Sequence, residues 1–171
     1  DAGHRPGRIV AASPQELSAL LRSAATAPAG LSSDASEISA CAQLLQAHDI
    51  DGLRRALSQV VLRRGLAEAV IGVFAPLTTR IGELWMSGEL QVFEEHIYSE
   101  SLQLVLRQAI QALPPAQGRC PKVLLTTLPG EGHALGLLMA EALLGLEGAV
   151  CLSLGVQTPL PQLPAAAAVH R

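Results

Sequence analysis

Aromatic residues are scarce in this chain of 171 residues. They make up 2% of the sequence, and all four lie in one window, at Phe74, Trp85, Phe93 and Tyr98. Leucine, alanine and valine can fill a core without aromatic side chains. The clustering therefore indicates a binding site or a local packing centre between residues 74 and 98.

Positive charge is also in short supply. Charged residues amount to 16% and the formal net charge is -3. This excludes a strongly basic protein that binds nucleic acid through its phosphates with these residues alone. Apolar residues make up 49%, which is typical of a globular chain, and the length suits one domain or two small ones.

Cysteine motifs and membrane-spanning segments are absent from the sequence. Cys41, Cys120 and Cys151 are widely spaced, which argues against a zinc site or a disulfide framework and favours reduced thiols in the cytoplasm. Because the sequence starts with Asp1 and polar residues, we expect no signal peptide. The most apolar stretch, 134–156, carries two glutamates and four glycines, so we do not expect a transmembrane helix.

The sequence patterns in the first part of the chain predict mainly helices. Residues 1–12 read as an extended piece, a helix is predicted to start at Ser13, and 27–36 has the composition of a linker. Apolar periodicity then predicts four helices with short connections, over 38–48, 53–64, 66–86 and 92–113. Asp51 is a candidate cap for the second of them, and Pro76 is expected to kink the third. These features predict an antiparallel four-helix bundle over 37–115.

After Pro121 the spacing of the apolar residues no longer has the helical period. Short apolar runs at 122–127 and 149–154 predict buried parallel strands, with a helix over 133–146 between them. The fold class is therefore a helical bundle followed by an α/β unit over 121–171. Two strands cannot cover both faces of a sheet, so the chain is expected to be cut short. Pro161 and Pro164 are expected to delay any third helix.

The loop after the first predicted strand carries Glu131, His133 and Gly136. A carboxylate two residues from a histidine can hold one imidazole nitrogen while the other nitrogen reaches a metal. Gly136 lets a large group approach the helix. The alternative is a glycine-rich turn with a surface histidine. A nucleotide-binding G-x-G-x-x-G loop is not matched, because Leu135 stands at the third glycine.

A second group lies where the third and fourth predicted helices meet. Trp85 ends one helix, and Glu95 and His96 lie in the first turns of the next, so all three can converge at one end of a helical hairpin. The alternative is a core tryptophan beside an exposed Glu-His pair.

Other polar residues give weaker signals. We expect His4, His48 and His170 to be solvated. The pairs Arg54-Arg55 and Arg63-Arg64 predict a solvated face or, as the alternative, a protein-binding one. Paired carboxylates at Glu94, Glu95 and Glu100 could suggest acid–base work, but no Ser-His-Asp or Cys-His arrangement supports an enzyme.

The first loop resembles the D/E-x-H-x-x-G motif of cobalamin-binding domains, which have a Rossmann-like fold. The resemblance implies that His133 is the lower ligand of cobalt, oriented by Glu131, and that the tail of the cofactor enters a slot beside Gly136. It also implies cofactor contacts near the strand ends, at Val123, Leu154, Gly155 and Thr158. The family has three more strands, so 121–171 would form the N-terminal part of such a domain and bind cobalamin weakly.

The spacing Trp85-x9-Glu95-His96 resembles the cap of CarH-type repressors, the cobalamin-dependent photoreceptors among MerR-like regulators. It implies that these side chains pack over the adenosyl face of adenosylcobalamin. Residues 1–36, around Arg5–Leu17, resemble the tail after a MerR-like DNA-binding domain, and the winged helix itself is not among these residues.

The resemblance implies a light-sensing module of a transcriptional repressor rather than an enzyme. The implied partners are further copies of the chain, as a dimer or tetramer that light dissociates, and DNA through a winged-helix domain; no membrane is implied. Two alternatives stay open: a corrinoid carrier subunit of a methyltransferase, and a cobalamin-binding antirepressor.

Overall fold

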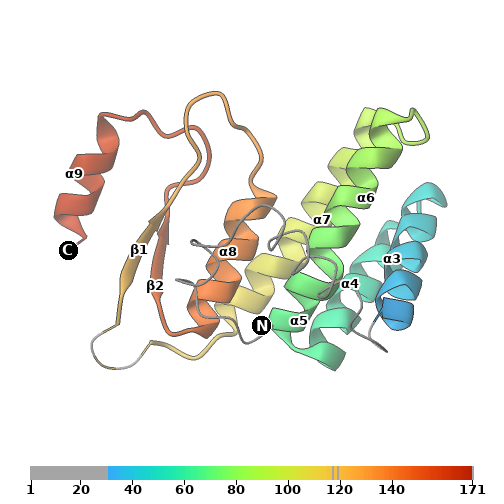
Figure 1. Ribbon diagram of the computed structural model, residues 1–171, viewed down its shortest axis with the longest axis horizontal. Coiled ribbons are helices and arrows are strands. Elements are labelled where there is room, and N and C mark those ends of the chain that lie inside the picture. Colours follow the sequence, from blue (N-terminus) through green and yellow to red (C-terminus); the bar gives the residue numbers. More distant parts are fainter. Residues whose placement is uncertain (1–30, 117, 119, 171) are drawn as a thin grey trace, which may run out of the picture. The chain divides into compact units, whose positions relative to one another are not determined.

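The computed structural model describes residues 31–116, 118 and 120–170. The chain divides into two units, Asp1–Ser36 and Glu37–Arg171. The second unit is mostly helical and holds one parallel sheet of two strands (Figure 1). The extended piece predicted for 1–12 and the helix predicted from Ser13 lie outside the described residues. None of the described helices is long and apolar enough to cross a membrane.

Helices make up most of the described residues before the sheet. They are α3 (Leu31–Gln46), α4 (Ile50–Arg64), α5 (Leu66–Glu68), the π-helical stretch η1 (Ala69–Phe74), α6 (Ala75–Met86) and α7 (Val92–Gln111). The start of α3 corrects one prediction, because it lies inside the predicted linker 27–36. Asp34 lies in the first turn of α3, where the helix dipole favours a negative charge.

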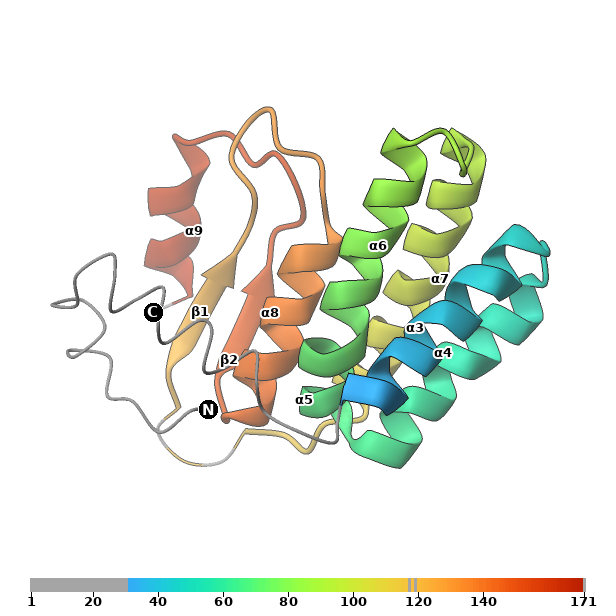
Figure 2. The same ribbon diagram turned by 45° about the vertical axis from the view of Figure 1, so that its right-hand side comes forward.

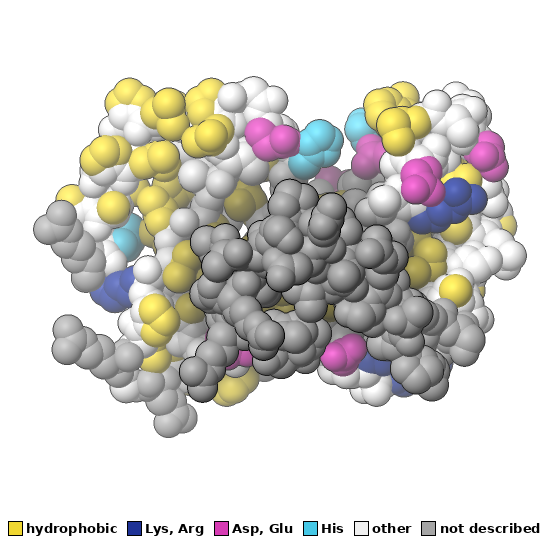
Figure 3. Space-filling model, in the orientation of Figure 1, with side chains coloured by type: hydrophobic (Ala, Val, Ile, Leu, Met, Phe, Trp, Pro, Cys, Tyr) yellow, Lys and Arg dark blue, Asp and Glu magenta, His cyan; other side chains and the backbone are white. Residues whose placement is uncertain are grey.

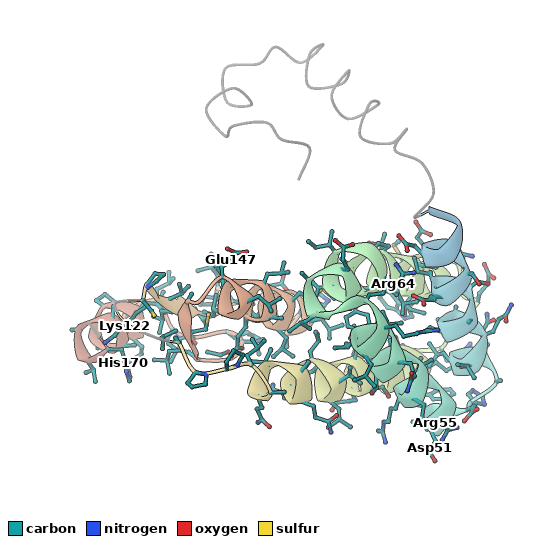
Figure 4. All side chains as sticks on the ribbon, turned by 90° about the horizontal axis from the view of Figure 1, so that it is seen from below. Asp51, Arg55, Arg64, Lys122, Glu147 and His170 are labelled. Carbon is teal, nitrogen blue, oxygen red and sulfur yellow. The ribbon has the colours of Figure 1, made fainter. Side chains whose placement is uncertain are left out.

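The cap of α4 differs from the prediction. Asp49, rather than Asp51, accepts a hydrogen bond from the Gly52 N–H over 2.8 Å. Asp49 stands three residues before Gly52, the spacing at which a side-chain oxygen reaches the third amide of a helix. Asp51 lies inside the helix, and Figure 4 shows it projecting outward from α4.

The helix predicted over 66–86 is interrupted just before Pro76. Proline has no N–H, and its ring clashes with the carbonyl four residues earlier, here that of Gly72. The chain widens into the π-helical stretch η1 at this point, and the Ala75 N–H bonds to the carbonyl of Val70, five residues back. The kink predicted at Pro76 therefore takes the form of a π-helical stretch directly upstream of it.

The sheet and its helices follow. They are β1 (Lys122–Leu125), α8 (Leu135–Leu146), β2 (Val150–Ser153) and α9 (Gln162–Val169). The two strands are parallel, with Lys122 opposite Val150, which confirms the predicted pairing. The strands are not fully buried, however: Val150 is 46% exposed. In Figures 1 and 2, α8 and α9 lie on opposite sides of the sheet, and α9 has no buried residue.

The last helix corrects another prediction. Pro164 was expected to delay it, yet α9 begins at Gln162 and includes Pro164. A proline in the first turn costs no hydrogen bond, because the first amides of a helix have no partner within the helix.

One apolar core joins α8 to the preceding helices. Leu57 and Phe74 are fully buried, and so is Ala142 of α8, with Leu138 at 4% exposure. Helix α8 packs against α7 and α5 as well as β2. The separate four-helix bundle predicted for 37–115 is therefore not confirmed. The α8 sequence is apolar almost all round, so it needs cover on the side away from the sheet, and α7 provides that cover.

Candidate functional site

The loops that leave the carboxyl ends of β1 and β2 lie at one edge of the sheet (Figure 1). The first, residues 126–134, leads into α8, and the second, residues 154–161, leads to α9. Because the strands are parallel, both loops emerge on the same side. This is the edge at which open α/β sheets bind ligands.

Glu131 and His133 are joined within the first loop. Nδ1 of His133 lies 2.5 Å from Oε1 of Glu131, and the backbone N–H of His133 donates to the same oxygen over 2.9 Å. A carboxylate accepts hydrogen bonds, so Nδ1 carries the proton and Nε2 keeps its lone pair. The His133 side chain is 92% exposed, and Nε2 is therefore accessible to a metal from solvent.

These hydrogen bonds favour the ionised form of Glu131. The backbone N–H of His133, and then its imidazole, hold the pKa of the Glu131 carboxyl below its ordinary value, against a smaller opposing effect of desolvation. The Glu131–His133 pair is therefore intact at a pH above the ordinary carboxyl pKa. It is lost as the pH falls through the lowered pKa of Glu131. At neutral pH Glu131 is thus an anion that orients the imidazole.

Open space lies over Gly136 in the first turn of α8. A Cβ built there would meet no atom within 4 Å, and the backbone is not in the left-handed region. The packing of the chain therefore does not require glycine at this position, and a group could approach the helix here. Gly130 differs, because its φ of 95° is a conformation that favours glycine.

A hydrogen-bond network that the sequence did not predict supports the second loop. Thr126 Oγ1 lies 2.9 Å from the carbonyl oxygen of Gly155 and 2.7 Å from Thr158 Oγ1. Gly155 and Thr158, both predicted cofactor contacts, are thus tied to the end of β1. Leu154 donates its N–H to the Leu125 carbonyl, and Val123 lies within β1. Two threonines directly after an apolar strand were the signal that could have indicated this network.

The second predicted group lies at the α6–α7 turn. Trp85 stands one residue before the end of α6 and is 49% exposed, while Glu95 and His96 lie in the first turns of α7. His96 Nδ1 lies 2.8 Å from Glu95 Oε2, and Ser99 donates to the other Glu95 oxygen. The buried Tyr98 hydroxyl and Thr78 Oγ1, 2.7 Å apart, link α7 to α6.

Glu94 and His48 form a pair that the sequence did not predict. His48 was expected to be solvated, but its Nε2 lies 2.8 Å from Glu94 Oε1, and its ring packs beside that of Phe93. Glu94 also accepts from the Gln91 N–H, and this bond is the main reason that the pKa of Glu94 lies below its ordinary value. The Gln91-x-x-Glu94 spacing of a capping box could have indicated the bond to Gln91, but not the bond to His48. Glu94 and Glu95 therefore bind different histidines rather than forming a carboxylate pair.

The arginine pairs of α4 have separate roles. Arg54 and Arg55 are exposed, and Arg55 projects outward near Asp51 in Figure 4. Arg63 and Arg64 both pair with Glu37 of α3, with N···O distances of 3.0 Å. The first pair lies on an exposed face, as both alternatives for it require, and the second pair fastens α4 to α3.

The two candidate groups face the same end of the Glu37–Arg171 unit. The β1–α8 loop and the α6–α7 turn both lie at the top in Figures 1 and 2. Figure 3 shows histidine and acidic side chains on both sides of a notch in this upper edge. Within the described ranges, no three His, Cys, Asp or Glu side chains come together to enclose a metal ion.

Comparison with known proteins identifies related chains. Residues 38–110 match the family model described as B12 binding domain. Two solved structures have a TM-score of 0.41 with this fold. One is the methanol:cobalamin methyltransferase complex MtaBC of Methanosarcina barkeri, which is 15% identical and is matched over 78% of this chain and 52% of that chain. The other is a cobalamin-binding protein of Desulfitobacterium hafniense DCB-2, which is 22% identical and is matched over 77% of this chain and 63% of that chain.

A curated relative is the HTH-type transcriptional repressor CarH of Myxococcus xanthus. It is 33% identical over 118 residues, which is 69% of this chain and 39% of the relative. The chain thus spans well under half the length of that protein. The family model and this relative agree with the resemblance found in the motifs, and together they support a CarH-type segment that includes a B12 binding domain.

Proposed function

We propose that this chain is the cobalamin-binding, light-sensing module of a transcriptional repressor, with adenosylcobalamin as its chromophore. The match to a B12 binding domain and the CarH relative support the class of protein. The observation that carries the proposal at the site is the Glu131–His133 pair, which leaves Nε2 of His133 accessible at the carboxyl edge of the sheet.

The residues at this edge fit cobalamin. The corrin ring supplies four nitrogens to cobalt, so one imidazole from the protein is sufficient. His133 would hold cobalt, Glu131 would keep the imidazole in the required tautomer, and the open space over Gly136 would admit the tail of the cofactor. Adenosylcobalamin, when bound, supplies a cobalt–carbon bond that visible light breaks. The other proposed contacts are Val123, Leu154, Gly155 and Thr158.

The α6–α7 hairpin would recognise the adenosyl group. Trp85 has an exposed ring for stacking, and Glu95 and His96 offer polar groups on the adjoining helix. Loss of the adenosyl group would remove a contact that favours one position of this hairpin, which is how a ligand shifts a two-state element.

The whole protein would act by assembly rather than by turnover. Copies would associate in the dark as a dimer or tetramer in the cytoplasm, and DNA would be bound by a winged-helix domain outside these residues. The CarH relative favours this function over a corrinoid carrier subunit of a methyltransferase or an antirepressor.

Electron paramagnetic resonance of bound, reduced cobalamin tests the proposal. The wild-type spectrum should show splitting from one histidine nitrogen, and His133→Ala should lose it. His170→Ala, at the end of α9, is the matched control and should keep the splitting. The same splitting in wild type and His133→Ala would contradict the assignment of His133.

A further inference from the structure

Thr127 connects the two loops at the carboxyl edge of the sheet. Its Oγ1 donates a hydrogen bond to the Glu131 carbonyl over 2.5 Å and accepts one from the Gln157 N–H over 2.8 Å. The Thr127 hydroxyl thus donates a hydrogen bond to the first loop and accepts one from the second loop. The neighbouring Thr126 bonds to other residues of the second loop, Gly155 and Thr158.

The two partners of Thr127 lie directly around His133. Glu131 is the residue whose carboxylate holds the imidazole of His133, so a bond to its carbonyl fixes the backbone from which that carboxylate extends. Gln157 lies close by, because a Cβ on Gly132 would be 3.7 Å from its side-chain nitrogen. Gln157 has a φ of 57°, which is uncommon for a residue other than glycine and needs support from its surroundings.

The first loop has few contacts besides hydrogen bonds to fix its conformation; apart from the Thr127 bond, these are the bond of the Glu131 N–H to the Leu128 carbonyl, over 3.0 Å, and the bonds between Glu131 and His133. Residues 128–133 are all exposed, and buried apolar contacts begin only at Leu135. A segment with few buried contacts opens easily unless hydrogen bonds hold it.

We propose that Thr127 is a positioning residue, whose hydroxyl fixes the backbone of Glu131 and thereby the direction in which His133 presents Nε2. The link to cobalt rests on the proposed function, whereas the effect on the loop does not. Because valine has nearly the shape of threonine but no hydroxyl, Thr127→Val removes both hydrogen bonds, while Thr127→Ser keeps them.

The first measurement uses the cobalamin-free protein. Backbone amide exchange at Gln157 and His133 should be about three- to tenfold faster in Thr127→Val, and close to wild type in Thr127→Ser. The matched control is Thr79→Val on the exposed face of α6, where Thr79 donates to the Ala75 carbonyl; it should leave both amides unchanged. Wild-type exchange in Thr127→Val would overturn the proposal, whether or not cobalamin binds.

The second measurement uses cobalamin and its electron paramagnetic resonance. Thr127→Val should lower the histidine-ligated fraction and weaken cobalamin binding about three- to tenfold, with recovery in Thr127→Ser. Faster exchange with unchanged ligation would overturn the positioning role. Wild-type protein that binds no cobalamin would contradict the proposed function instead. In that case the amide exchange data alone test the role of Thr127 in the loop. Exchange that is faster in Thr127→Val and close to wild type in Thr127→Ser would support that role.

Discussion

At the residue scale, two glutamates use the same local arrangement. Glu131 accepts from a backbone N–H and from His133, and Glu94 accepts from the Gln91 N–H and pairs with His48. The backbone bond is the larger cause of the lowered pKa in both. The Glu131 pair lies at the candidate site, whereas the Glu94 pair fastens the start of α7 to the α3–α4 turn.

The Glu94 pair predicts a pH-dependent loss of stability. Because its pKa is lowered in the folded state, its contribution is complete above the ordinary carboxyl pKa of about 4.3 and disappears as the pH falls through the lowered value. Glu94→Gln should therefore lower the melting temperature at pH 7. The gap to wild type should shrink as the pH falls from the ordinary carboxyl pKa through the lowered pKa of Glu94, and a gap that stays constant in thermal unfolding would contradict this role.

Trp85 carries a prediction about selectivity. Stacking of a nucleoside on an aromatic ring is worth about 1–3 kcal/mol. Trp85→Ala should therefore weaken adenosylcobalamin binding about 5- to 150-fold and leave hydroxocobalamin binding less affected. Titration of both cofactors measures this, and equal affinity of wild type and Trp85→Ala for the adenosyl form would reduce Trp85 to a surface residue of the hairpin.

At the residue scale, the sequence was informative about contacts between residues that are close to each other in the chain. Glu131 and His133 are two residues apart, so their contact could be predicted from the spacing as one of two alternatives, and the structure contains it. The partners of His48 and Thr127 were missed, because Glu94 lies 46 residues from His48 and Gln157 lies 30 residues from Thr127. Only the fold brings such pairs together.

At the scale of elements, periodicity and breakers predicted most helices and both strands. The exact cap was not predictable, since Asp49 and Asp51 are chemically equal and the choice depends on which side chain meets the Gly52 N–H. Pro76 and Pro164 mark positions in the sequence, but the π-helical stretch and the early start of α9 depend on how the neighbouring backbone relaxes.

Two glycines in helices give opposite predictions. A Cβ on Gly52 would lie 2.2 Å from Asp49 Oδ2, so Gly52→Ala should displace the cap and cost about 0.5–2 kcal/mol. A Cβ on Gly82 in α6 would meet nothing within 4 Å, so Gly82→Ala should stabilise the protein by about 0.5–1 kcal/mol. Urea unfolding of the cobalamin-free variants measures both, and equal effects would contradict the cap.

At the scale of the whole Glu37–Arg171 unit, α8 unites the helices with the sheet. The change of period predicted the β-α-β order, but no local pattern shows that α8 also packs against α7. That contact joins elements distant in the chain, and it explains why the helical bundle was predicted as a separate unit.

The shared core predicts joint unfolding. Leu138→Ala should cost about 2–5 kcal/mol and speed amide exchange in α7 as well as in α8, because Leu138 is 4% exposed in the common core. Leu128→Ala, at a 61% exposed position, should change stability little. Loss of protection confined to α8 would show instead that the helices before it fold as an independent bundle.

The central claim is that this unit binds adenosylcobalamin through His133 and responds to light. The most direct test is the absorption spectrum of adenosylcobalamin mixed in the dark with an excess of the chain, recorded before and after green light. We predict that the spectrum changes permanently on illumination and that the illuminated spectrum differs between wild type and His133→Ala. Illuminated spectra that are identical in wild type and His133→Ala would contradict the claim.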